Sequence, residues 1–387
     1  MPLERSEKGM EFIMTDRKIG NIEAISLVLT IMINHIILNL PKSLISTTSS
    51  GSIINVIFIS IIVLGIVFLV CQLFKRFPNF DILDISKFLG GKWLKILMGI
   101  LFIAYLVFTM SILLRSFSEG LKIIFFPKTS VPIIMLLFIL AIIVANKLGF
   151  SSIVRSTLFF MPIVLISILF IFIANLDNFT IERMFPLLGN EWIPTFFSGL
   201  SNLFAFGGIS YLYLLPPHLK DQKGYSKIAF TSIGISAFYL LISVATLLFM
   251  FPFFTTTEEV FPLYLASRFI EFGRFFQRLD AVFLLIWILS VVSYLCIAFY
   301  FTTSIFQKIT NMQYTKWYVT LFAALVFGIS LLPENMQQIN FLENTVYKYI
   351  IIILIFIVGL SVLLLANLKY NMIQKKKGVV NIEKTMG

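Results

Sequence analysis

The sequence is poor in charge and nearly free of cysteine and histidine. Only 13% of its 387 residues are charged, against about 25% in soluble proteins, while 59% are hydrophobic and the mean hydropathy is +0.97. This composition excludes a water-soluble enzyme, and it excludes a disordered chain because disorder requires little apolar surface. The two cysteines, Cys71 and Cys296, lie in apolar runs far apart, so neither a disulfide framework nor a CxxC motif is available.

Motifs that carry catalysis are also missing. The sequence has no GxSxG, P-loop or HExxH motif, and no Gly-rich dinucleotide turn in a βαβ setting. We therefore expect the protein not to be an enzyme, and we expect it to need no cofactor and no metal.

What the sequence has instead is long apolar runs. A bilayer core about 30 Å thick needs about 20 apolar residues in helical conformation. Ten such runs occur, of which the fourth and ninth are short. Their ranges are 22–40, 53–74, 93–114, 131–145, 152–174, 192–215, 228–254, 281–306, 317–332 and 349–367. We expect each run to cross a membrane.

Positive charge alternates between the loops that join these runs. If the N-terminus is cytoplasmic, 21 of the 30 Lys and Arg residues fall on the cytoplasmic side, which gives net charges of +12 inside and −1 outside. This is the positive-inside pattern, so we expect both termini to be cytoplasmic. The basic excess then reports orientation, with some attraction of the lipid bilayer by the lysine run 375–377, and it argues against nucleic-acid binding.

Ten spans divide into two halves of five, and because five is odd the second half enters the membrane from the opposite face. Inverted repeats of this kind are the plan of many secondary transporters, in which discontinuous helices hold substrate near the midplane. We predict an all-α integral membrane domain over 22–368 with ten transmembrane helices. Its halves are 22–174 and 192–368, and the cytoplasmic segments are 1–21 and the basic tail 369–387.

Spans one and six each contain a weak point ahead of a proline. In span one, Asn34 and His35 precede Pro41. In span six, the glycine pair 207–208 precedes Pro216. Broken helices are tolerated in a membrane only where the freed backbone groups face a cavity or a ligand. We predict that both helices are broken and form the binding site. The alternative is that these are ordinary kinks and close-packing glycines.

Polar side chains on spans three and eight complete the candidate site. Tyr105 and Thr109 could offer hydroxyl groups to a small ligand, or could join helices. His35, one of only two histidines, has proton coupling or ligand binding as candidate roles, and a neutral hydrogen bond between helices as the alternative. The candidate ligand-binding residues are Ile33, Asn34, His35, Ile36, Tyr105, Thr109, Phe206, Gly207, Gly208, Ser210, Tyr211, Trp287 and Tyr294.

Short motifs recur in order along the chain. They are LPKS at 40–43, RSFSE at 115–119, FPLLG at 185–189, LPPHLK at 215–220, QRLD at 277–280, LIWI at 285–288 and LLPE at 331–334. With ten spans between them, these motifs resemble the B-subunit family of spore germinant receptors. Those proteins are endospore germination permeases of the amino acid–polyamine–organocation superfamily. The resemblance covers nearly the whole chain, from Ile22 to about Lys369.

The resemblance implies a LeuT-like fold that serves as a receptor in the spore inner membrane. Such a subunit binds a small, amino acid-like germinant and works with an A-type membrane subunit and a C-type lipoprotein subunit. In the superfamily, ligands bind at the unwound middles of helices one and six, with side chains from helices three and eight. The alternative is a secondary amino acid transporter, proton-coupled through His35, and a purely structural scaffold is the third hypothesis.

Two positions in the implied pocket depart from the family pattern. The family's break in helix one usually carries glycines, whereas this chain has Asn34, His35 and Ile36 there. Ser210 stands where an acidic residue is frequent. A ligand amine would lose an acidic partner at this position, while His35 offers a new polar contact. We therefore do not expect an alanine-like germinant by default.

Overall fold

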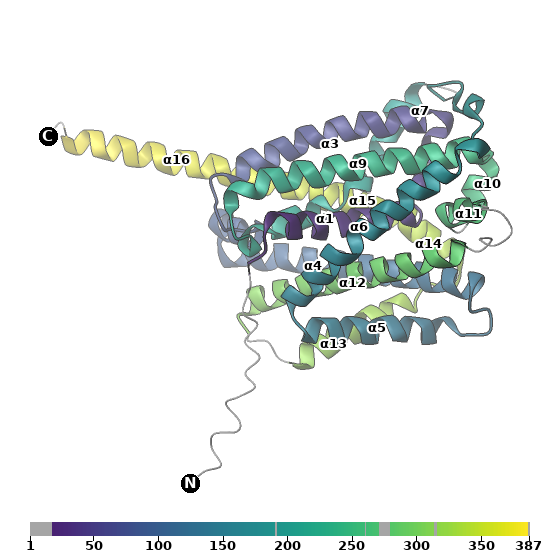
Figure 1. The fold of residues 1–387 in the computed structure, drawn as a ribbon. Coiled ribbons are helices and arrows are strands. Elements are labelled where there is room, and N and C mark those ends of the chain that lie inside the picture. The colour runs from purple at the N-terminus through teal and green to yellow at the C-terminus, as the bar shows by residue number, and fades with distance from the viewer. Residues whose placement is uncertain (1–17, 190–191, 260, 271–278, 313–315, 386–387) are drawn as a thin grey trace, which may run out of the picture.

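The computed structural model describes residues 18–189, 192–259, 261–270, 279–312 and 316–385. Every regular element in these ranges is a helix, and the helices form one bundle (Figure 1). Residues 1–17 of the predicted cytoplasmic segment 1–21 and residues 277–278 of the QRLD motif lie outside the described ranges. α16 leaves the bundle at one end, called here the terminal end. α10, α11 and α14 lie at the opposite, distal end (Figure 1).

Each of the long helices overlaps one of the predicted apolar runs. They are α3 (Ser52–Phe74), α4 (Ile82–Ile124), α5 (Val131–Lys147), α6 (Phe150–Ala174), α9 (Tyr225–Met250), α12 (Leu279–Thr310), α13 (Lys316–Ser330) and α16 (Leu360–Thr385). The first, sixth and tenth predicted spans are instead divided into shorter pieces. These are α1 (Asn21–Ile37), α2 (Leu40–Thr48), α7 (Trp192–Phe196), η4 (Ser198–Phe206), α8 (Ile209–Leu214), α14 (Met336–Phe341), η7 (Leu342–Tyr347), α15 (Lys348–Ile351) and η8 (Ile352–Gly359). Two short helices, α10 (Phe253–Glu258) and α11 (Pro262–Arg268), follow α9.

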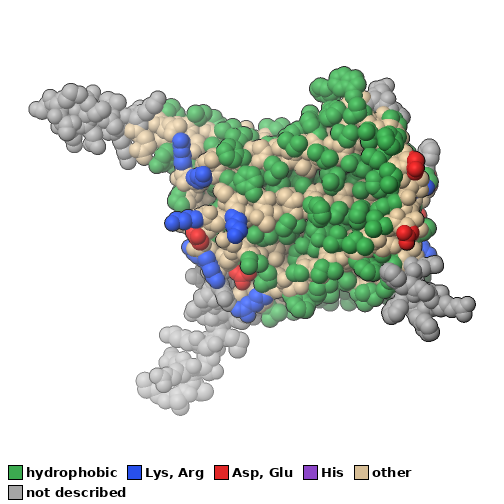
Figure 2. Space-filling view, turned by 45° about the horizontal axis from the view of Figure 1, so that its top comes forward, with side chains coloured by type: hydrophobic (Ala, Val, Ile, Leu, Met, Phe, Trp, Pro, Cys, Tyr) green, Lys and Arg blue, Asp and Glu red, His purple; other side chains and the backbone are tan. Residues whose placement is uncertain are grey.

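Length and hydropathy make this a multi-pass membrane protein. In the described residues, six helical segments are long and apolar enough to cross a bilayer, and three shorter apolar helices accompany them. Apolar side chains are also exposed around the bundle: Phe159 and Ile166 are each 66% exposed and Leu137 is 63% exposed. Figure 2 shows these apolar side chains as a belt, with Lys and Arg gathered at the terminal end. A soluble monomer rarely exposes so much apolar surface. The count of ten spans stays a prediction.

The first span is interrupted ahead of its proline. In a continuous helix, the ring of Pro41 would clash with the carbonyl group of Ile37, and its nitrogen would donate no hydrogen bond. α1 ends at Ile37, Leu38 leaves helical geometry with ψ of −99°, and α2 begins at Leu40. The interruption lies at residues 38–39, a few positions after the predicted weak point, because Asn34, His35 and Ile36 are still part of α1.

The sixth span changes its helical type where the glycine pair occurs. η4 is a 3₁₀ helix of nine residues, longer than most such helices, and α8 begins directly after Gly208. Gly207 and Gly208 keep right-handed helical φ and ψ values. The pair therefore marks a change from 3₁₀ to α geometry and is not unwound.

A kink in α4 separates a short helix at the terminal end from the apolar span. Gly91 has φ of 74° and ψ of −161°, a conformation that glycine alone adopts readily. Before the kink, the Asp81 carboxylate caps the helix by accepting hydrogen bonds from the N–H groups of Leu83 and Asp84. Lys308 of α12 pairs with Asp81 at 2.6 Å and with Asp84 at 2.5 Å. These ion pairs hold the short helix against the end of the bundle.

Replacing Gly91 with alanine tests the role of this kink. Gly91→Ala should lower the free energy of unfolding by about 1–3 kcal/mol, because a Cβ disfavours this backbone conformation. Gly65→Ala is the matched control. Gly65 lies within α3 and an added Cβ there meets no atom within 4 Å, so this change should stabilise the protein by about 0.5–1 kcal/mol. The free energies of unfolding of the two variants are compared by thermal unfolding in detergent. Equal changes in the two variants would contradict a requirement for glycine at the kink.

Candidate functional site

A pocket lies at the interruption of the first span. It is called here the central pocket, and its volume is about 40 Å³. Its lining comes from α1 and α2 with the residues between them, from α4, from η4 and from η7. The lining residues are His35, Leu38, Asn39, Leu40, Ser43, Thr109, Ile112, Leu113, Phe204, Glu343, Asn344 and Tyr347. This volume holds water but no molecule as large as an amino acid without a movement of the walls.

A carboxylate closes the central pocket at the interruption. The side-chain amide of Asn39 donates a hydrogen bond to Glu343 Oε2 at 2.6 Å. Glu343 lies in η7, a π-helical turn, and π-helical turns in α-helices are frequent at functional sites. A carboxylate in a transmembrane helix is costly and typically marks a substrate or ion pathway. Asn39 and Glu343 therefore connect the break in the first span with the tenth span.

His35 contacts the other wall of the central pocket. Its Nε2 lies 3.0 Å from the hydroxyl of Tyr347. The His35 ring stacks on that of Tyr347 and meets the ring of Tyr294 edge to face, each with ring centroids 5.4 Å apart. These contacts place a titratable ring between α1, α12 and η7, within reach of a molecule in the pocket.

Hydroxyl groups on α4 and α8 meet beside the central pocket. Thr109 lines the pocket and donates to the carbonyl oxygen of Tyr105 at 2.8 Å. The hydroxyls of Tyr105 and Ser210 lie 3.3 Å apart, and Ser210 also donates to the carbonyl oxygen of Gly207 at 2.8 Å. Tyr105 and Ser210 thus connect span three to span six behind the lining.

Several predicted site residues pack outside the pocket lining. Asn34 points to α12, where its amide donates to Ser290 Oγ at 3.0 Å and to the Ser290 carbonyl at 3.1 Å. An added Cβ would lie 2.6 Å from Met32 at Gly208, and 2.8 Å from Ile351 at Gly207. The glycine pair therefore allows close packing.

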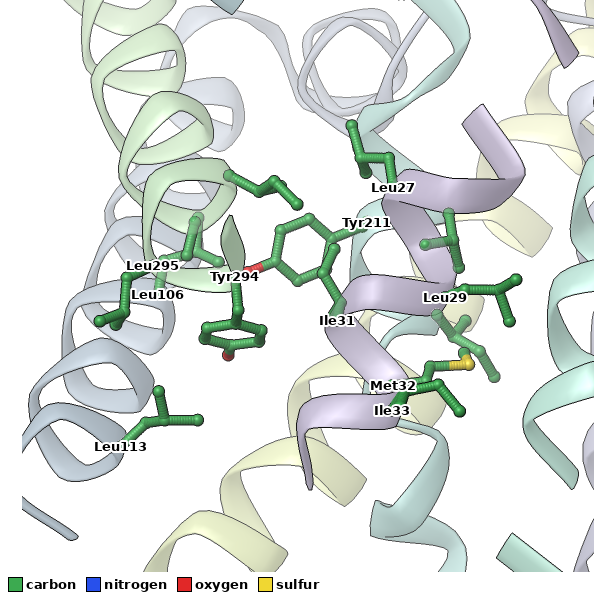
Figure 3. Close-up of a cluster of buried hydrophobic side chains, with 14 of the residues drawn as sticks. Leu27, Leu29, Ile31, Met32, Ile33, Leu106, Leu113, Tyr211, Tyr294 and Leu295 are labelled. Atoms are coloured by element: carbon green, nitrogen blue, oxygen red, sulfur yellow. The ribbon is translucent and has the colours of Figure 1, made fainter. Parts of the chain in front are cut away.

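The remaining predicted residues lie in the core. Ile33, Ile36 and Phe206 are buried. Figure 3 shows Tyr211 and Tyr294 among the apolar side chains packed between α1 and α12. Tyr211 meets Phe301 edge to face, and Trp287 meets Tyr264 in the same way. None of these side chains lines the central pocket.

Sequence reasoning missed the contribution of the tenth span. Glu343, Asn344 and Tyr347 line the central pocket, although the predicted tenth span began at Tyr349. The available signal was the polar run from Glu343 to Thr345 directly ahead of a long apolar stretch. The π-helical geometry that aims Glu343 at Asn39 leaves no recognisable sequence pattern. Asn39 is a polar residue two positions ahead of Pro41, but the sequence indicates no partner for it.

The arrangement of the helices defines a membrane protein with a LeuT-like fold, as known transporters have it. The solved structure of MhsT in complex with L-phenylalanine aligns with a TM-score of 0.64 at 12% identity, over 90% of this chain and 98% of that chain. A Na⁺-coupled sialic acid symporter aligns with a TM-score of 0.63 at 11% identity, over 88% of this chain and 80% of that chain. At these identities the likeness concerns the fold.

The sequence profile described as spore germination protein, a spore permease family, matches residues 18–339. The chain belongs to this family. Spore germination protein A2 of Bacillus subtilis (strain 168) is 24% identical over 330 residues, which cover 84% of this chain and 89% of the relative. Spore germination protein GerQB of Bacillus cereus is 21% identical over 267 residues, covering 69% and 73% respectively. The resemblance inferred from the motifs is thereby confirmed, and the protein is a permease-type membrane protein, not an enzyme.

A double-mutant cycle measures the contact between Asn39 and Glu343. Asn39→Ala and Glu343→Gln should show a coupling of about 0.5–2 kcal/mol in thermal stability, because Asn39→Ala removes the donor of this hydrogen bond and Glu343→Gln replaces its charged acceptor with a weaker, neutral one. The control cycle combines Asn39→Ala with Glu334→Gln, at an exposed glutamate outside the pocket lining. This control should be additive within about 0.5 kcal/mol. Additivity in both cycles would contradict the contact.

Proposed function

We propose that this protein is the B-type membrane subunit of a germinant receptor in the spore inner membrane. It binds a small, amino acid-like nutrient in the central pocket and triggers germination together with an A-type membrane subunit and a C-type lipoprotein subunit. Both termini face the spore core. The observation that carries the proposal is the Glu343 carboxylate, hydrogen-bonded to Asn39 at a helix break in a membrane protein of the germination permease family.

The interruption supplies complementary partial charges for a zwitterion. The C-terminal end of α1 presents backbone carbonyl groups with partial negative charge, and the N-terminal end of α2 presents N–H groups with partial positive charge. Leu38, Asn39 and Leu40 line the central pocket at this point. A ligand amine would find the Glu343 carboxylate and the end of α1, while a ligand carboxylate would find the start of α2. Glu343 would thus serve as the acidic partner for a ligand amine, in place of the acidic residue that is frequent in the family at the position of Ser210.

The small volume of the pocket connects binding to a change of conformation. At about 40 Å³ the pocket is closed to an amino acid, so a nutrient must bind a more open arrangement. A ligand that favours the open arrangement shifts the population towards it. Such a shift in α1, α2 and η7 would be the event that partner subunits detect.

Secondary transport is the second candidate function. It is favoured by the fold shared with a symporter and by His35, a titratable ring that contacts Tyr347 at the pocket wall. Uptake of radiolabelled amino acids into proteoliposomes under a pH gradient separates the two functions. The receptor function predicts binding without accumulation. Concentrative uptake that is lost in His35→Gln would overturn it in favour of proton-coupled transport.

The charge of Glu343 should matter to the response. In spores whose only functional receptor contains the Glu343→Gln variant, the amino acid concentration for half-maximal germination should rise roughly 10- to 100-fold. This factor corresponds to the loss of a hydrogen bond to a charged group, which contributes about 1.5–3 kcal/mol. Glu334→Gln is the matched control and should leave the response unchanged. Germination is followed by the loss of optical density over a panel of common L-amino acids, with receptor abundance checked by immunoblot. An unchanged response at equal abundance would remove Glu343 from the site.

A further inference from the structure

A second and larger cavity lies beside the central pocket towards the distal end. It is called here the outer cavity, and its volume is about 790 Å³. It lies between α4, α13 and the segment containing α14 and η7, and Phe108, Ile112, Ile329, Gln337 and Leu342 are among its lining residues. Its size is that of a small-molecule site. In the part of the chain that the structure describes, no Lys, Arg, Asp or Glu side chain lines it.

The two cavities share part of their lining. Ile112 of α4 lines both the outer cavity and the central pocket. Leu342 lines the outer cavity, and the next residue, Glu343, lines the central pocket. The same turn of η7 therefore has one side in each cavity. A movement of Ile112 or of this turn would join the two volumes.

The π-helical geometry of η7 makes this turn suited to movement. A π-helical turn contains one residue more than an α-helical turn, and its hydrogen-bonding pattern is rarely sustained. Return of residues 342–347 to α geometry would rotate Leu342 and Glu343 about the helix axis. The Glu343 carboxylate would then turn away from Asn39, which donates a hydrogen bond to it in the closed arrangement.

We propose that the outer cavity is the access vestibule of the central pocket, and that Ile112 together with the turn Leu342–Tyr347 forms the gate between them. The inference rests on the proposed function in that a nutrient binds in the central pocket. It adds the route, the gate and a selection by charge. A closed gate explains why the central pocket is too small for an amino acid while the outer cavity beside it is large enough to hold one.

The lining of the vestibule defines the class of solute that it admits. Its surface is mainly apolar, and its polar groups are uncharged: the amides of Asn335, Gln337 and Gln338 and the hydroxyl of Ser111. A bare ion would lose hydration there without a compensating charge. An uncharged molecule with an apolar portion loses much less, and a zwitterion is intermediate because its two opposite charges partly compensate each other. The vestibule therefore favours uncharged or zwitterionic solutes with an apolar side chain over ions.

Cysteine labelling tests the gate without knowledge of the nutrient. The two native cysteines, both free and buried, are first replaced by alanine, and Asn344→Cys then places a thiol in the central pocket. The probe is methyl methanethiosulfonate.

Ile112→Ala should raise the labelling rate roughly tenfold by favouring the open arrangement. Leu113→Ala is the matched control, because Leu113 lines the central pocket but not the outer cavity, and should change the rate much less. Equal effects of the two variants, or no effect of Ile112→Ala, would overturn the gate; Ile112→Val replaces the alanine variant if that protein does not fold.

Blocking the vestibule tests the route. Gln337→Trp should slow labelling of Asn344→Cys roughly tenfold, whereas Lys128→Trp, at an exposed position outside the outer cavity, should leave it unchanged. An unchanged rate in Gln337→Trp would show that solutes enter elsewhere. Labelling of Phe108→Cys, at a half-buried position in the lining of the outer cavity, distinguishes a water-filled vestibule from a lipid-filled groove in nanodiscs. Fast reaction with a charged, water-soluble thiosulfonate supports the vestibule. Reaction only with a membrane-partitioning maleimide means that an acyl chain fills the cavity and overturns the proposal. Labelling is measured without any nutrient. A negative labelling result therefore contradicts the gate alone and leaves the proposed binding of a nutrient to its own test.

Discussion

The need to satisfy backbone hydrogen bonds without water is the constraint on which the rest of this structure depends. In a bilayer each unpaired N–H or C=O group costs several kcal/mol, so a helix can be interrupted only where protein or a cavity receives the freed groups. Pro41 forces such an interruption after Ile37. Asn39 and Glu343 bring polar side chains to the same place. The central pocket is the consequence of that local requirement.

Polar contacts between helices stabilise the arrangement around the break. Asn34 joins α1 to α12 through Ser290, and Tyr105 joins α4 to α8 through Ser210. Further along η4, the Asn202 amide donates to Asn55 Oδ1 at 2.8 Å. In an apolar solvent the hydrophobic effect does not drive helices together, and packing and hydrogen bonds of this kind replace it. These contacts fix the relative positions of the helices that line the pocket.

The same arrangement serves a receptor and a transporter, because both need two states of one bundle. A transporter opens a central site to each side in turn, whereas a receptor needs only a ligand-dependent change that a partner detects. The helix types outside the α-helix are concentrated in the sixth and tenth spans, in η4, η7 and η8. Because their hydrogen bonding is less favourable, we expect these segments to rearrange at a lower cost than the α-helices. The long α-helices form the rigid remainder.

Apolar runs, loop charges and Pro41 are local features, so the sequence by itself determined the membrane class, the approximate helix positions, the family and the interruption of the first span. His35 and Thr109 were also predicted because polar residues in apolar helices are conspicuous. Only the tertiary structure decided which side chains meet. Glu343 lies 304 positions from Asn39, and a separation of that size has no sequence period. The structure likewise showed close packing at Gly207 and Gly208, because a glycine permits an unwound helix and a tight contact equally well, and only the neighbouring atoms distinguish the two.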